Sequence, residues 1–369
     1  MTEPIRVAQV VGKMVGGGVE AVVMNYYRHI DRSKVQFDFL VDSDSTLVPR
    51  EEIESLGGRI FEIPPYQHAI EYQRELQSLF TQEGWKIVHS HINALSVFPL
   101  RAAKKAGVPV RIAHSHSTSG KGEFSKNALK GFLKLFSTGY PTDLAACTEY
   151  AGKWLFGSSH FTVFNNAIDL SSFSFNRSIR NEQRAGLGAQ DDTLVLGNIG
   201  RFIPQKNQLF LLDVFKAVYA QNPDSILVIC GDGKLRPQAE EKARSLGIAS
   251  AVRFLGQISN VQDVYQALDL FVLPSLYEGL GMVAIEAQAS GLPCICSERV
   301  PNEVALSSRC SFVPLGAGVE GWSNAILTTR TDVVNRSDSQ ASLGFESYDI
   351  FRAAPKLEEY YLKLFETVN

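Results

Sequence analysis

The sequence predicts an α/β protein of two doubly wound domains, each a parallel sheet covered by helices on both faces. The chain has 369 residues, more than the roughly 250 to 300 at which one core usually stops growing. Short apolar or β-branched runs alternate with helix-length amphipathic segments, the order that parallel sheets require. The alternation stops once, in the polar stretch NNAIDLSSFSFNRS, and then starts again.

The candidate strands fall into two groups separated by that polar stretch. The first group is RVAQVV (6–11), FDFLV (37–41), KIVHS (86–90), VRIAHS (110–115), DLAAC (143–147) and FTVF (161–164). The second is TLVLGNIG (193–200), SILVIC (225–230), VRFLG (252–256), DLFVLPS (269–275) and PCIC (293–296). We expect a first domain over residues 1–166, rejoined by the C-terminal helix at about 350–369, a linker around 165–190, and a second domain over 167–349.

The composition is that of an ordinary globular protein. Hydrophobic residues make up 45%, charged residues 20%, and the formal net charge is -3, which does not favour nucleic acid as a partner. The longest apolar runs, such as LDLFVLPSL, are far shorter than the roughly 20 residues of a membrane span, and no signal peptide pattern opens the chain. We expect a cytoplasmic protein whose 5 cysteines are reduced core thiols.

The segment YEGLGMVAIE carries two acids, Glu278 and Glu286. Glu278 should lie in the loop at the carboxyl edge of strand 269–275, and Glu286 about two turns into the following helix. Glycines between them would let a ligand phosphate approach the amides at the helix start, while the carboxylates accept hydrogen bonds from sugar hydroxyls. Alternatively, the acids complement the helix dipole and face solvent.

The loop GRFIPQKN places Arg201 and Lys206 after strand 193–200, at the same predicted sheet edge as the acids. A guanidinium and an ammonium there can clamp two phosphates and stabilise charge on a leaving diphosphate. A solvated basic loop is the alternative. Because the acidic and basic segments share one edge, we favour a site.

The first predicted strand is followed by the glycine run Gly16, Gly17 and Gly18, whose bare amides would suit an anion. With Ala21 and Asp42 this run also fits the dinucleotide fingerprint of dehydrogenases. That fingerprint begins directly after a strand, whereas here the residues GKMV intervene.

Two strand ends carry histidine pairs, His89 with His91 and His114 with His116, each pair on one face of its strand. The pairs could ligate zinc, but we see no third histidine or carboxylate at metal spacing and expect no metal. His116 could instead hydrogen-bond a substrate hydroxyl at the mouth of the site.

Basic residues dominate 101–134, where Glu123 is the acid among Arg101, Lys104, Lys105, Arg111, Lys121, Lys126, Lys130 and Lys134. With nearby Phe and Leu residues, this stretch would suit contact with an anionic membrane surface. A normal amphipathic surface helix is the alternative.

In their order, these motifs resemble the retaining glycosyltransferases of family 4, which have the GT-B fold of two Rossmann-like domains facing across a cleft. The matching segments are EGLGMVAIE with the following AQASGLPCI, GRFIPQKN, VICGDG (228–233), VRFLG and NNAID. The sequence is most similar to the exopolysaccharide and capsule enzymes of bacteria. It departs from the family at Asn166 and Ala167, where Asn-Gly is usual, and in EGLG for EGFG.

The resemblance implies a role for each candidate residue. Arg201 and Lys206 would bind the donor diphosphate, Glu286 the ribose and Glu278 the transferred sugar. His116 would lie near the reacting carbon, so that His116, Glu278, Arg201 and Lys206 form the catalytic set. Gln257 and Ile258 would lie beside the nucleotide base. The remaining donor contacts would come from Gly16, Gly17 and Gly18 and from the amides of Leu280, Gly281, Met282 and Val283.

The implied reaction moves a sugar from a nucleotide-diphosphate sugar, for which we expect a UDP-sugar, to a polyprenyl-linked glycan at the inner membrane face, with retention of configuration and without a metal or cofactor. Two alternatives stay open. One is a nucleotide-sugar epimerase of the same architecture, and the other is a non-catalytic protein that binds sugar nucleotides.

Overall fold

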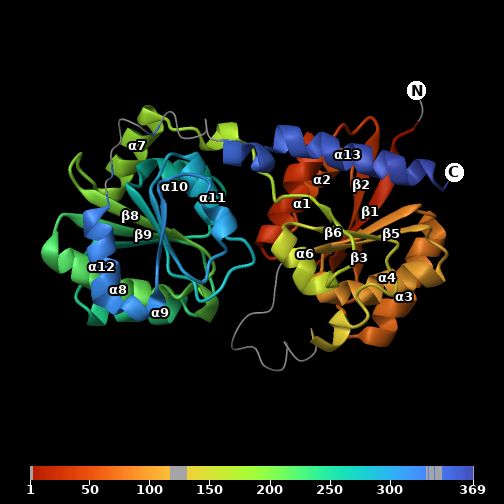
Figure 1. Ribbon diagram of the computed structural model, residues 1–369, viewed down its shortest axis with the longest axis horizontal. Helices are drawn as coiled ribbons and strands as arrows, with labels where there is room; N and C mark the ends of the chain where they lie inside the picture. Colours follow the sequence, from red (N-terminus) through yellow and green to blue (C-terminus); the bar gives the residue numbers. More distant parts are fainter. Residues whose placement is uncertain (1–2, 117–130, 330, 332–335, 337–342, 369) are drawn as a thin grey trace. The chain divides into compact units, whose positions relative to one another are not determined.

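The computed structural model describes residues 3–116, 131–329, 331, 336 and 343–368. The chain divides into two compact units, one formed by Met1–Ile168 with Ser347–Asn369 and the other by Asp169–Glu346. Each unit is a parallel sheet with helices on both faces (Figure 1), so the predicted doubly wound α/β architecture is confirmed.

The first unit has the strand order β3-β2-β1-β4-β5-β6-β7. Its strands are β1 (Ile5–Gly12), β2 (Val35–Asp42), β3 (Arg59–Ile63), β4 (Ile87–Ser90), β5 (Val110–Ser115), β6 (Asp143–Ala146) and β7 (Thr162–Val163). Its helices are α1 (Gly18–His29), α2 (Arg50–Ser55), α3 (Ala69–Glu83), α4 (Val97–Lys105), α6 (Glu149–Phe156) and α13 (Ile350–Glu366).

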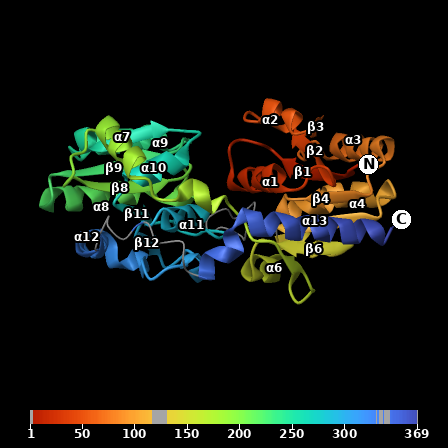
Figure 2. The same ribbon diagram turned by 90° about the horizontal axis from the view of Figure 1, so that it is seen from above.

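Alternate side chains of the first sheet pack into two apolar cores, one on each face. Residues of α1 and α13 pack on one face and residues of α3, α4 and α6 on the other. The C-terminal helix α13 therefore lies in the first unit beside α1 (Figure 2). Its Tyr361 is fully buried in that core.

The second unit has the strand order β10-β9-β8-β11-β12-β13. Its strands are β8 (Leu194–Ile199), β9 (Ser225–Cys230), β10 (Val252–Gly256), β11 (Leu270–Leu273), β12 (Cys294–Ser297) and β13 (Cys310–Val313). Its helices are α7 (Arg177–Leu187), α8 (Gln208–Gln221), α9 (Arg236–Ser245), α10 (Val261–Ala267), α11 (Met282–Ala289) and α12 (Gly318–Thr328).

In both sheets the strand order reverses direction at one point, between β1 and β4 in the first and between β8 and β11 in the second. Ligands of open parallel sheets bind outside the carboxyl ends of the strands at such a switch point. Gly16 follows β1, Lys206 follows β8 and Glu278 follows β11, whereas His116 follows β5 and Gln257 follows β10.

The structure differs from the sequence-based expectation in three elements. Strands β3 and β13 were not predicted, and residues 177–187 form helix α7 rather than a linker. The cysteines are free thiols, as expected, and all but Cys310 are buried. Within the described ranges, no helix has both the length and the apolar character needed to cross a bilayer.

Candidate functional site

A largely buried ion pair joins the loops that follow β8 and β11. Lys206 ends a short 3-10 helix, Pro204–Lys206, and its Nζ lies 2.7 Å from Glu278 Oε1. Ser275 donates to the same carboxylate oxygen at 2.7 Å, and Gln205 reaches the other oxygen at 3.3 Å. The Lys206 and Glu278 side chains are only 16% and 6% exposed. The predicted basic and acidic segments thus meet directly at the switch point of the sheet.

Glu286 lies on α11 and accepts a hydrogen bond from a buried tyrosine. Tyr265, on α10, donates its hydroxyl to Glu286 Oε2 at 2.8 Å and also lies 3.1 Å from the Val283 carbonyl oxygen. Burial raises the pKa of Glu286, while the Tyr265 hydrogen bond and the Lys206 charge lower it. Because α11 begins at Met282, Glu286 lies about one turn into the helix rather than the expected two.

The start of α11 exposes peptide amides next to this cluster. Gly281 caps the helix with φ 96°, a left-handed conformation in which a side chain would be strained, and an added Cβ would lie 3.3 Å from Val300 Cγ1. No group in the described part of the chain accepts a hydrogen bond from the amides of residues 280–283. These N–H groups and the helix dipole favour an anion at this position.

The other predicted residues of the second unit lie on the same sheet edge without touching the cluster. Arg201 follows β8 and is exposed, and its guanidinium has no ionic or hydrogen-bond partner among the described residues. Gln257 and Ile258 follow β10, the edge strand, and lie two strands away from β8. The structure therefore brings together Lys206, Glu278 and Glu286. Arg201, Gln257 and Ile258 lie apart from this cluster.

The glycine loop of the first unit does not have the bare amides that the sequence predicted. Glu20, in the first turn of α1, folds back so that its Oε2 accepts hydrogen bonds from Val15, Gly16 and Gly17 at 3.0, 2.7 and 2.9 Å. The carboxylate stands where an external anion would otherwise bind. The spacing Gly17-x-x-Glu20, with an acid at the third helical position, was the available signal, since such acids commonly reach back to the helix start.

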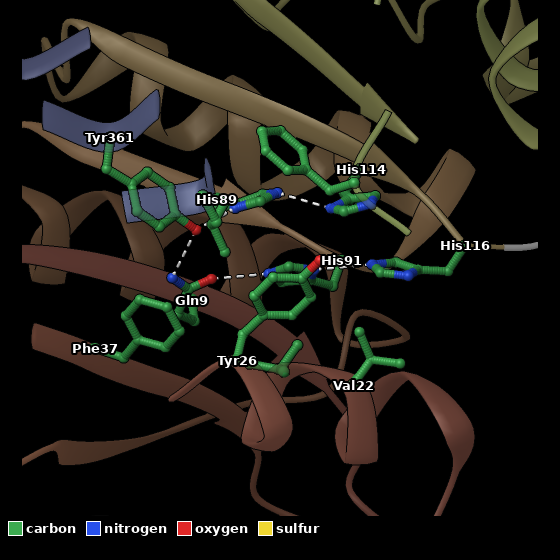
Figure 3. Close-up of a pocket in the computed structure, with 12 residues that line it drawn as sticks. Gln9, Val22, Tyr26, Phe37, His89, His91, His114, His116 and Tyr361 are labelled. Carbon is green, nitrogen blue, oxygen red and sulfur yellow. Dashed lines mark hydrogen bonds between the residues drawn. The ribbon is translucent and has the colours of Figure 1, made fainter. Parts of the chain in front are cut away.

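The histidines form a buried cluster on the face of the first sheet covered by α1 and α13 (Figure 3). His89 and His91 come from β4 and the residue after it, and His114 and His116 from β5 and the residue after it. None of them is more than 6% exposed. His116 is 5% exposed and lies at the end of the described residues that follow β5.

Burial decides the charge state of this cluster. It lowers the pKa of His116 to about 4, with the Asn166 side chain acting in the opposite direction. It also lowers the pKa of His89, His91 and His114 well below the usual histidine value. All four imidazoles are therefore neutral at pH 7.

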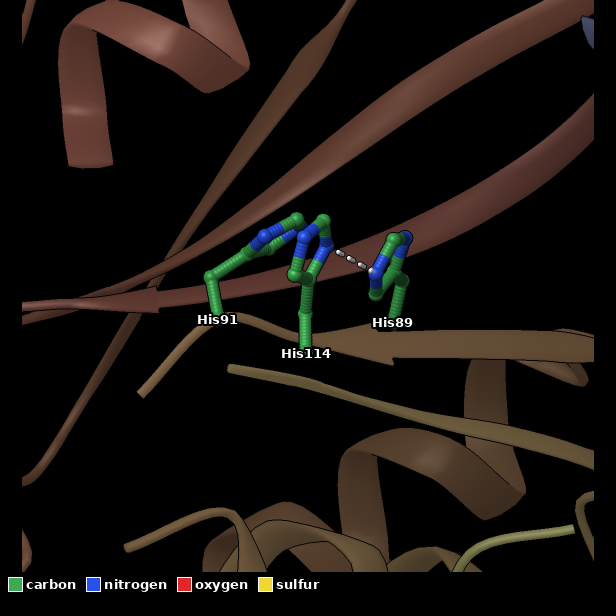
Figure 4. Close-up of side chains that lie close together, drawn as sticks. All are labelled: His89, His91 and His114. Atoms are coloured by element: carbon green, nitrogen blue, oxygen red, sulfur yellow. Dashed lines mark hydrogen bonds between the residues drawn. The ribbon is translucent and has the colours of Figure 1, made fainter. Parts of the chain in front are cut away.

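A third histidine does arrive at metal spacing, contrary to the expectation from sequence. Ring nitrogens of His89, His91 and His114 lie within 4.8 Å of one another (Figure 4). The sequence could not show this, because it depends on the register between β4 and β5. In that register His89 pairs with Ile112, so His114, two residues further along β5, lies near both His89 and His91. In the structure both ring nitrogens of His89 and of His91 take part in hydrogen bonds.

The basic stretch 101–134 lies partly outside the described residues, which omit 117–130. In the described part, Lys104 and Lys134 lie over the rings of Tyr140 and Trp154 at 5.9 and 5.4 Å. Phe132 and Leu135 are 59% and 76% exposed.

Comparison with known proteins gives a consistent result along the chain. The family model described as "Glycosyl transferases group 1" matches residues 179–306, and the model described as "Glycosyl transferase 4-like domain" matches residues 17–140. The first match contains Arg201, Lys206, Glu278 and Glu286, and the second contains the glycine loop and the histidine cluster.

Similar curated proteins align over most of their length. EpsF of Bacillus subtilis (strain 168), named as a glycosyltransferase, is 37% identical over 93% of this chain and 93% of its own. The UDP-Gal:alpha-D-GlcNAc-diphosphoundecaprenol alpha-1,3-galactosyltransferase of Escherichia coli is 26% identical over 83% of this chain and 84% of its own. The capsular polysaccharide biosynthesis glycosyltransferase CapH of Staphylococcus aureus is 25% identical over 97% of this chain and 99% of its own.

Solved structures share the fold. Anabaena HepE in complex with UDP-glucose superposes with a TM-score of 0.80 at 17% identity, covering 97% of this chain and all (100%) of its own. WaaG, a glycosyltransferase of lipopolysaccharide biosynthesis, superposes with a TM-score of 0.75 at 14% identity, covering 96% and 99%. At such identities the likeness concerns the arrangement of the backbone.

Proposed function

This chain belongs to the glycosyl transferases group 1 family, and from that premise we propose that it transfers a sugar from a UDP-sugar to a polyprenyl-linked glycan during exopolysaccharide or capsule synthesis. The name of the similar Escherichia coli enzyme gives a UDP-sugar donor and a diphosphoundecaprenol-linked acceptor. HepE, which has the same fold, binds UDP-glucose. CapH acts in capsular polysaccharide biosynthesis.

The observation that carries the proposal is the cluster of Lys206, Glu278 and Glu286 beside the free amides of α11. A donor diphosphate would take Lys206 and those amides, with Arg201 adding a second positive charge from the same loop. Glu286 would accept hydrogen bonds from the ribose, and Glu278, freed from Lys206, from the transferred sugar.

The proposed reaction retains the configuration of the sugar. The bond between the anomeric carbon and the diphosphate oxygen breaks, and its electron pair leaves with the diphosphate. The acceptor hydroxyl oxygen then bonds to the anomeric carbon on the same face, and its proton passes to the departing phosphate oxygen. Lys206 and Arg201 stabilise the leaving charge, so the proposed step uses neither a metal ion nor a carboxylate nucleophile. A hydrolase that uses two carboxylates would need them on opposite sides of the scissile bond, whereas Glu278 and Glu286 lie at one edge of one sheet.

The experiment is a transfer assay with UDP-sugars and a polyprenyl-diphosphate-linked glycan. We expect Glu286→Ala to abolish transfer without lowering the melting temperature, because the half-buried carboxylate would bind the ribose. Glu320→Ala is the matched control, since Glu320 is an exposed acid in the first turn of α12. Full activity in Glu286→Ala would refute the assignment.

The same assay separates the alternatives. Incubation with the UDP-sugar alone should leave it largely intact, whereas an epimerase would convert it to a second sugar nucleotide. A protein that only binds the donor would show no turnover with any acceptor.

A further inference from the structure

A continuous chain of hydrogen-bonded polar side chains runs through the core of the first unit, under the carboxyl ends of its strands (Figure 3). Each member is at least nine-tenths buried, so water does not compete for these bonds. The members, in order, are His116, His91, Gln9, Tyr361, His89 and His114, and the successive distances are 2.9, 2.8, 3.1, 2.6 and 3.0 Å.

The amide of Gln9 sits in the middle and fixes the direction of the bonds on both sides. Gln9 Nε2 donates to the Tyr361 hydroxyl, so the Tyr361 hydrogen is left to donate to His89 Nδ1. A neutral imidazole has one N–H and one bare nitrogen. His89 therefore carries its proton on Nε2 and donates it to His114 Nδ1, which places the His114 proton on Nε2 as well.

The other side follows by the same logic. Gln9 Oε1 can only accept, so His91 donates from Nε2. Its bare Nδ1 must then accept from His116 Nε2. His116 consequently keeps its proton on Nε2, directed inward, which leaves Nδ1 as a bare acceptor, and the Asn166 side chain interacts with His116. At the other end of the chain, the protonated His114 Nε2 has no hydrogen-bond partner among the described residues.

This order is collective. If the Gln9 amide turned over, every bond in the chain would have to reverse, and His116 Nδ1 would become a donor. A partial reversal would set two N–H groups, or two bare nitrogens, against each other in a core without water, and each bond left unmade there is costly. The orientation of the Gln9 amide therefore sets the order on both sides, toward His116 and toward Tyr361 on the C-terminal helix.

We propose that Gln9 is a positioning residue that decides which ring nitrogen of His116 carries the proton, and hence whether His116 accepts or donates a hydrogen bond toward the transferred sugar. Tyr361 sets the same order on the other side of Gln9, at His89 and His114. The part concerning the sugar rests on the proposed function. The part concerning the proton does not, because every hydrogen bond of the chain joins two groups of the protein itself.

The arrangement fits this role better than it fits a metal. The distances between histidine nitrogens are those of N–H to N hydrogen bonds. The small cavity of about 10 Å³ that the cluster lines has room for about one water-sized atom, and its lining residues include no carboxylate to balance a divalent charge.

The test is long-range 1H–15N NMR of the whole protein labelled with 15N-histidine, in which protonated and bare ring nitrogens have separate shifts. The chain has only 7 histidines, so single histidine substitutions can assign the signals. We expect His89, His91, His114 and His116 to be neutral and to share one tautomer, with the proton on Nε2. In Tyr361→Phe the signals of His89 and His114 should change tautomer, and those of His91 and His116 should stay.

Tyr26→Phe is the matched control, because Tyr26 lines the same cavity but donates to the Asn165 carbonyl oxygen outside the chain. It should leave all four histidine signals unchanged. Mixed tautomers in the unmodified protein, no response to Tyr361→Phe, or an equimolar metal ion in the purified protein would each overturn the proposal.

An activity measurement completes the test. Gln9→Met keeps the length of the side chain and removes both hydrogen bonds, so we expect turnover to fall about tenfold, equivalent to one substrate hydrogen bond. Tyr26→Phe should turn over normally. If the unmodified protein transfers no sugar, the proposed function fails while the tautomer result stands by itself.

Discussion

Glu286 shows at the residue scale how burial and one hydrogen bond oppose each other. In the role that we propose, the carboxylate must be ionised to accept hydrogen bonds from the ribose. Burial raises the pKa of Glu286 and so disfavours ionisation, whereas the hydrogen bond from the Tyr265 hydroxyl lowers this pKa and favours ionisation. We therefore expect Tyr265 to affect donor binding through Glu286, although it is fully buried and would touch no substrate.

In Tyr265→Phe the pKa of Glu286 should rise, because the hydrogen bond that favours the charged form is gone. The proton would then stay on the carboxyl up to a higher pH. UDP affinity should fall about five- to tenfold, the worth of one hydrogen bond to a charged group, and the loss should be larger at pH 6 than at pH 8. Calorimetry with UDP at both pH values measures this.

The control is Tyr219→Phe, on α8 and away from the cluster. It should bind UDP normally. An equal loss of affinity at pH 6 and pH 8 in Tyr265→Phe would show that the hydroxyl does not act through ionisation of Glu286.

Which single residues could be predicted depended on how local their neighbours are. Lys206 and Glu278 each follow a strand directly, so the carboxyl ends of parallel strands predicted that both lie at one edge, and they are in contact. The burial of His116 and the contacts of Tyr361 depend on α13, more than 200 residues away in sequence. No local pattern carries that information.

At the scale of elements, the glycine loop and α1 are joined by the side chain of Glu20. Its carboxylate satisfies N–H groups that the loop would otherwise leave open. The hydrogen bonds to the Glu20 carboxylate therefore stabilise the conformation of the glycine loop.

We expect Glu20→Ala to lower the free energy of unfolding by about 2 to 3 kcal/mol, because these amides lose a charged acceptor in a place that is only 9% exposed. Glu51→Ala, at an exposed acid in the first turn of α2, should change it by less than about 0.5 kcal/mol. Urea denaturation of the two variants checks this. Equal midpoints would mean that the Glu20 contacts do not form in solution.

The elements that the sequence did not predict share a physical cause. Strands β3 and β13 are the edges of their sheets and are only partly buried, so they lack the apolar runs of central strands. Helix α7 packs through buried ion pairs rather than through an apolar stripe. Arg180 Nη2 lies 2.5 Å from Asp269 Oδ1, and Arg184 Nη1 lies 2.9 Å from Asp269 Oδ2. Hydrophobic periodicity cannot detect such a helix.

At the scale of the whole molecule, the fold was predictable because the strand and helix order repeats twice along the chain. Each unit then carries its polar residues at the switch point of its own sheet. In the second unit Lys206 is paired with Glu278, so the proposed diphosphate would have to compete with a carboxylate for the ammonium group.

The central claim is that Lys206 holds the donor diphosphate, and calorimetric titration of the full chain with UDP tests it most directly. We predict that Lys206→Ala weakens UDP binding by at least about tenfold, since a charge-assisted contact to phosphate is worth roughly 1.5 to 3 kcal/mol. Lys216→Ala, at an exposed lysine on α8, should bind like the unmodified protein. UDP affinity in Lys206→Ala equal to that of the unmodified protein would contradict the account.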